Sequence, residues 1–119
     1  MILTEVEIQE AIKQAKAAFP SFSEWEYNNE VNDSYCGFSL WGELAIKDND
    51  SITQYFFVTL DSYKDKWCGH LSIGKPCYFW SSADVGDANL LDTQPCKALE
   101  DALLALKGEI AALFKILLP

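Results

Sequence analysis

The fold is decided by residues 35–81, YCGFSLWGELAIKDNDSITQYFFVTLDSYKDKWCGHLSIGKPCYFWS. Runs of β-branched and aromatic residues over 35–46, 52–60, 67–73 and 77–81 alternate here with short polar links. Such runs are typical of strands, and short links favour antiparallel pairing between successive strands. The segment therefore predicts a four-stranded antiparallel meander.

Two amphipathic segments flank this region. Thr4 and Glu7 have the spacing of a capping box, and apolar residues then recur at helical spacing until Pro20. A second, broader apolar stripe over 96–117 predicts a C-terminal helix. Gly108 interrupts this stripe. A glycine at this position costs the helix roughly 1 kcal/mol relative to alanine, and it could mark a point where another part of the backbone approaches the helix closely. Residues 21–34 are polar and indicate a loop or a partial strand.

These predictions give the order α-β-β-β-β-α, a single α+β domain over residues 1–119 with both helices on one face of the sheet. Half of the residues are apolar, which is enough for a core without covalent links. The strands over 67–73 and 77–81 would form a hairpin in which Trp80 covers Gly69. Trp67, Leu71 and Ile73 would then face the core.

The charge of the chain restricts its partners. The net charge is −9, the sequence pI is about 4.4, and all nine basic residues are lysines. Without arginine, bidentate recognition of phosphate or guanine is disfavoured, so we expect neither nucleic-acid binding nor attraction to anionic membranes. A basic protein partner fits this charge. The N-terminus lacks the pattern of a signal peptide, which favours a cytoplasmic protein with reduced cysteines.

A histidine and three cysteines raise a second hypothesis. Cys68, His70 and Cys77 would share one face of the predicted hairpin, and Cys36 could join them from the first strand. Thiols and imidazole are zinc ligands, and a cysteine beside a histidine can act as a nucleophile. The spacing matches no zinc ribbon, however, and residues i and i+2 on a strand point in parallel. A metal-dependent or thiol enzyme is therefore the alternative rather than the leading interpretation, and no cofactor is expected.

Two candidate contact surfaces remain. The acidic loop after residue 81 offers Asp84, Asp87 and Asn89, and loops on rigid scaffolds often bind partners. If both helices cover one sheet face, Tyr55 and Phe57 would be exposed on the other face, where aromatic side chains favour protein contacts.

The end of the C-terminal helix is apolar on nearly all sides, which suggests a homodimer or another partner. The leading hypothesis is a non-enzymatic, acidic protein-binding or inhibitory domain, in a bacterium or its mobile elements. The enzyme described above is the alternative. A third hypothesis, that the protein mimics nucleic acid, is weaker than these two because the acidic residues are spread along the chain and do not form a cluster in the sequence.

Overall fold

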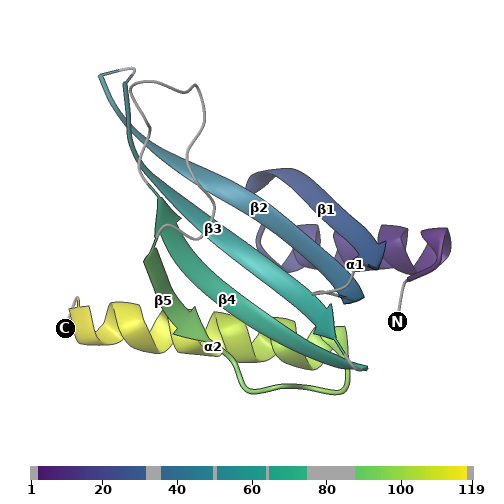
Figure 1. The fold of residues 1–119 in the computed structure, drawn as a ribbon. Coiled ribbons are helices and arrows are strands. Elements are labelled where there is room, and N and C mark those ends of the chain that lie inside the picture. The colour runs from purple at the N-terminus through teal and green to yellow at the C-terminus, as the bar shows by residue number, and fades with distance from the viewer. Residues whose placement is uncertain (1–2, 32–35, 50, 64, 75–87, 118–119) are drawn as a thin grey trace.

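The computed structural model describes residues 3–31, 36–49, 51–63, 65–74 and 88–117. Within them one antiparallel sheet has the strand order β1-β2-β3-β4-β5, so neighbours in the chain are neighbours in the sheet. The two helices pack on the same side of this sheet (Figure 1). The elements are α1 (Glu5–Ala18), β1 (Ser23–Val31), β2 (Cys36–Asp48), β3 (Ser51–Tyr63), β4 (Lys66–Gly74), β5 (Ala88–Asp92) and α2 (Leu99–Leu117).

The α+β class, the meander and the flanking helices are confirmed, whereas the expected strand count is too low. The polar segment after α1 forms β1, a complete strand paired with β2. Residues 88–92, expected to be loop, form β5. The strand expected over 77–81 lies outside the described residues.

Helix α1 begins as its sequence predicts. The Thr4 hydroxyl accepts a hydrogen bond from the Glu7 backbone N–H at 3.2 Å, and Glu7 Oε1 accepts one from the Thr4 N–H at 2.9 Å. This capping box satisfies two amides that the helix leaves without partners. The helix then buries Ile8, Ala11 and Ala15 against the sheet.

The core lies between the helices and one face of the sheet. Phe38, Leu40, Val58 and Leu60 are fully buried on the central strands β2 and β3. They alternate with residues on the opposite face, as the twofold period of a strand requires. Leu71 is buried in the same cluster and Trp67 packs against it, so the predicted core face of residues 67–73 is confirmed at these two residues.

Strand β4 corrects the predicted hairpin. Its two edges pair with β3 and β5, so the position assigned to residues 77–81 beside β4 is occupied by residues 88–92. Trp80, which was predicted to cover Gly69, lies outside the described residues. Gly69 faces Leu106 of α2, because a Cβ at Gly69 would lie 3.1 Å from Leu106 Cδ2. The missing side chain therefore lets α2 approach the sheet closely.

Candidate functional site

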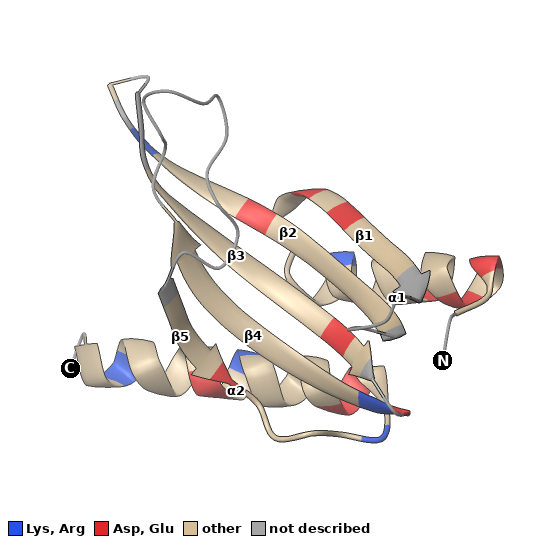
Figure 2. Ribbon diagram, viewed as in Figure 1, with Lys and Arg blue, Asp and Glu red and all other residues tan. Residues whose placement is uncertain are grey.

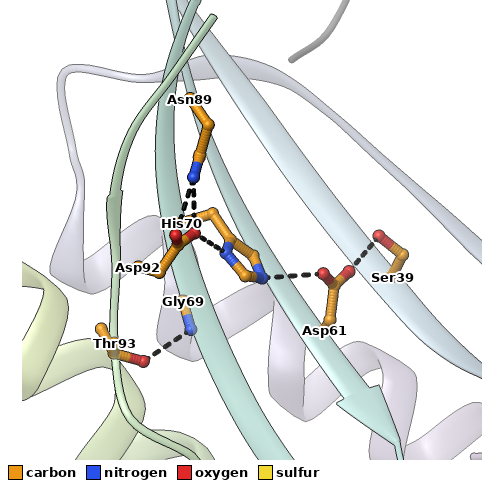
Figure 3. Close-up of polar contacts among 7 residues, drawn as sticks. All are labelled: Ser39, Asp61, Gly69, His70, Asn89, Asp92 and Thr93. Atoms are coloured by element: carbon orange, nitrogen blue, oxygen red, sulfur yellow. Dashed lines mark hydrogen bonds and ion pairs between the residues drawn. The ribbon is translucent and has the colours of Figure 1, made fainter.

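A charged cluster lies on the sheet face opposite the helices. His70 of β4 stands between two carboxylates from the neighbouring strands, Asp61 of β3 and Asp92 of β5 (Figure 3). Its Nε2 lies 3.0 Å from Asp61 Oδ2, and its Nδ1 lies 2.6 Å from Asp92 Oδ1. The pairing register brings these side chains together. His70 is directly opposite Asp92 on β5, and Asp61 on β3 is opposite Cys68, which lies two residues before His70 on the same face of β4.

This geometry requires a protonated ring. An ionised carboxylate only accepts hydrogen bonds, so both ring nitrogens of His70 must donate, and only the imidazolium can do so. The hydrogen bond to Asp61 is the largest cause that raises the pKa of His70 to about 9, against the opposing effect of burial. In return, the hydrogen bond from His70 holds the pKa of Asp92 below its usual value. At neutral pH the cluster is therefore a cation between two anions.

Two further side chains fix the carboxylates. The Ser39 hydroxyl donates to Asp61 Oδ1 at 2.6 Å, and Asn89 Nδ2 lies 2.8 Å from each oxygen of Asp92 (Figure 3). Ser39 is thus bonded to the acid and not to the imidazole, so His70 does not activate it as a nucleophile. The cluster links β2, β3, β4 and β5, and its protonated histidine is unsuited to act as a general base at neutral pH.

The thiol beside this cluster is also poorly suited to catalysis. Burial, followed by the negative charge of Asp61, raises the pKa of Cys68, so the thiol is protonated near neutral pH. A protonated thiol is a poor nucleophile and a poor metal ligand. Cys68 and His70 do share the face that the sequence predicts, but the ring nitrogens of His70 are engaged by the two aspartates.

The metal hypothesis is tested only in part. Among the described residues, no group of three or more histidine, cysteine or acidic side chains is arranged to hold a metal ion. Cys77 and the side chain of Cys36 lie outside the part of the structure that is described. Metal binding that includes them stays a prediction.

The expected aromatic contact surface is corrected at its two named residues. Tyr55 and Phe57 do lie on the face opposite the helices, but they are only 7% and 2% exposed. Their rings stack on each other, with centroids 5.9 Å apart, in the central strand β3. The prediction that these two rings are exposed is therefore wrong.

Of the acidic-loop residues only Asn89 lies in the described part of the chain, and its contact with a partner stays a prediction. Asp84 and Asp87 lie outside the described residues, and their role stays a prediction. Asn89 is exposed on β5, where its amide holds Asp92. It is therefore a support for the charged cluster.

Sequence reasoning missed Asp61 and Asp92, the two residues that define the cluster. Asp61 lies near the end of β3, and Asp92 is the last residue of β5. A signal for Asp61 existed, because Tyr55, Phe57, Thr59 and Asp61 alternate onto one face of β3. Only the register of β4 against both neighbours shows that His70 lies between the two acids.

A second feature lies at the C-terminal end of α2. Phe114, Ile116 and Leu117, which we call the terminal patch, are 47%, 77% and 60% exposed. The buried residues of the helix, by contrast, all lie in its first half: Leu99, Ala102, Leu103 and Leu106. Figure 1 shows the last turns of α2 continuing past the edge strand β5. The apolar stripe thus extends beyond the sheet that covers it.

In the part of the chain that the structure describes, neither helix combines the length and apolar character needed to cross a bilayer. Comparisons with protein-family models, curated proteins and solved structures found no match to this chain. The functional argument therefore rests on the residues themselves.

Proposed function

We propose that this protein is a non-enzymatic, cytoplasmic protein-binding domain that contacts its partner through the terminal patch of α2. The observation that carries the proposal is the exposure of Phe114, Ile116 and Leu117 within the last turn of one helix. Contiguous apolar side chains of this kind mark protein interaction sites, since leaving them in water forgoes roughly 25 cal/mol per Å² of stabilisation.

The chemistry of the charged cluster supports a binding role over catalysis. A histidine protonated at neutral pH and a thiol with a raised pKa offer neither a base nor a nucleophile. The cluster instead fixes the strands on which α2 rests. A rigid scaffold that presents an apolar helix end suits binding, because little conformational entropy is lost on association.

Photo-cross-linking tests this proposal. A benzophenone side chain would be placed at position 117, in the terminal patch, and in a second protein at position 16, where Lys16 is exposed on α1. We expect irradiation in the native cells to give an adduct of defined mass from position 117 and none from position 16. Sedimentation of the purified protein then shows whether the partner is a second copy.

Two results would contradict the proposal. One is the absence of any adduct at position 117, or the same adducts at both positions, since either would mean that the patch has no specific partner. The other is stoichiometric zinc in the purified protein that is lost on Cys77→Ser, because this would favour the metal-dependent alternative.

A further inference from the structure

A groove opens at the end of the molecule opposite the terminal patch. It lies between the first turns of α1, the link from β3 to β4 and the start of α2, and its cavity volume is about 470 Å³. Pockets for small ligands commonly have about 300–1,000 Å³. The groove is lined by the core residues Leu3, Ala11 and Leu99, by Trp67, and by Val6, which is 79% exposed.

The rim of this groove is acidic. Among the described residues that line the groove, Glu7 and Glu10 contribute from α1 and Asp65 from the β3–β4 link, against one cation, Lys97. All four side chains are exposed. Figure 2 shows acidic residues on α1, at the β3–β4 link and on the first turn of α2, at the same end of the molecule. An apolar lining is thus combined with a negative rim.

We infer that the groove binds a segment of the partner protein that carries arginine or lysine next to apolar residues. This inference rests on the proposed protein-binding function and names the chemistry of the partner. The aliphatic stems of these cations pack on apolar surface while their charged ends reach a polar rim. Carboxylates then accept charge-assisted hydrogen bonds from the cation, bidentate ones where it is arginine.

The charge of the whole chain favours the same partner. A net charge of −9 steers basic segments toward the protein and repels acidic ones. The capping box adds a local reason. Glu7 is held on the rim by its bond to the Thr4 N–H, so one acceptor of the groove is positioned before the partner arrives.

The test uses a synthetic probe, the acetylated and amidated peptide Leu-Arg-Leu-Arg, titrated into the full-length ¹⁵N-labelled protein. We expect saturable shifts of the backbone amides of Leu3, Val6 and Leu99, with a dissociation constant of about 1 mM or below. Two control peptides separate the contributions: Leu-Glu-Leu-Glu should not bind, and Ser-Arg-Ser-Arg should bind more weakly.

A pair of matched variants locates the site. Glu10→Gln combined with Asp65→Asn removes two rim charges, and asparagine tolerates the positive φ of 61° at position 65. Glu26→Gln combined with Glu43→Gln removes the same charge from β1 and β2. We expect the first pair to weaken binding by roughly threefold to tenfold and the second to change it by less than about twofold.

The outcomes separate this inference from the proposed function. The inference that the groove binds this segment would be overturned if both variant pairs weakened binding equally, or if the serine and leucine peptides bound equally well. Either result would be explained by charge attraction alone. Adducts at position 117 would leave the proposed function intact in that case. Conversely, groove binding without adducts at position 117 would overturn the terminal patch as the contact surface.

Discussion

The two halves of α2 carry the same apolar pattern but have different surroundings. Leu103 and Leu106 are 5% and 0% exposed, whereas Phe114 and Leu117 are 47% and 60% exposed. Each later residue follows its counterpart by eleven positions. Eleven residues make about three helical turns, so both members of each pair point to the same side of the helix. Periodicity therefore predicts an apolar face, and the extent of the sheet decides how much of that face is buried.

Truncating one leucine in each half tests the comparison most directly. Leu106→Ala should lower the free energy of unfolding by about 2–5 kcal/mol, because it leaves a cavity among the core residues. Leu117→Ala should cost less than about 1 kcal/mol, since this side chain is 60% exposed. Urea unfolding of both variants measures the difference. Equal losses would mean that the terminal patch is covered in the folded protein.

Gly69→Ala tests the contact between β4 and the first half of α2. The new Cβ would lie 3.1 Å from Leu106 Cδ2 and 3.2 Å from Leu106 Cβ, so Leu106 must shift by a few tenths of an ångström. Overpacking of this kind costs about 1–3 kcal/mol. Thermal unfolding should show the loss, and Gly69→Ala combined with Leu106→Ala should lose less than the sum of the two single variants. Strict additivity would contradict direct contact between these positions.

His70→Gln tests the cluster that ties β5 to the sheet. Because the partners Asp61 and Asp92 are 34% and 57% exposed, solvent screening reduces the loss at pH 6 to about 1 kcal/mol. Folding raises the pKa of His70 from 6.5 to about 9. Its contribution is therefore complete below pH 6.5, declines as pH rises toward 9 and is absent above that.

The pH dependence of this variant has an internal control. His70 is the only histidine of the chain, so the decline in stability of the parent between pH 6.5 and 9 should flatten in His70→Gln. Denaturant midpoints measured across this range provide the check. Parallel curves for the two proteins would contradict the protonated cluster.

Gly108→Ala gives the smallest expected effect, with the opposite sign. Apart from the helix's own backbone and the adjacent residues, no atom of the described residues lies within 4 Å of a Cβ built at this position, so they do not show the close backbone approach that was one of the two predictions for Gly108. Alanine in an exposed helix interior is favoured over glycine by about 0.5–1 kcal/mol. A higher melting temperature in calorimetry would confirm that the second half of α2 has room around it, and a lower one would contradict it.

The sequence predicts the fold better where local signals suffice. Thr4 and Glu7 specify the start of α1 by themselves, and the apolar runs of β2, β3 and β4 identify strands. Residues 21–34 were predicted to be a loop or a partial strand because most of them are polar, whereas Ser23–Val31 form the complete strand β1. Its alternation of Trp25 and Tyr27 with glutamates was the available signal, since Tyr27 stacks on Phe38 from the core side.

The charged cluster depends on information that no single segment carries. His70 could be placed on the face shared with Cys68, but its partners come from strands that are neighbours only once the register is set. The same holds for Tyr55 and Phe57, whose shared face the pattern predicts but whose burial it does not. Local pattern thus predicts the face of a side chain, whereas its neighbours require tertiary structure.

The strand order of the sheet has a consequence for how the chain folds. Since spatial order equals chain order, each ladder from β2 to β4 can form as a hairpin with only a short loop to close. The contact between α1 and α2 is the exception, because it joins opposite ends of the chain. Contacts that close short loops form more readily than distant ones, so we expect the meander to form early and the two helices to meet last.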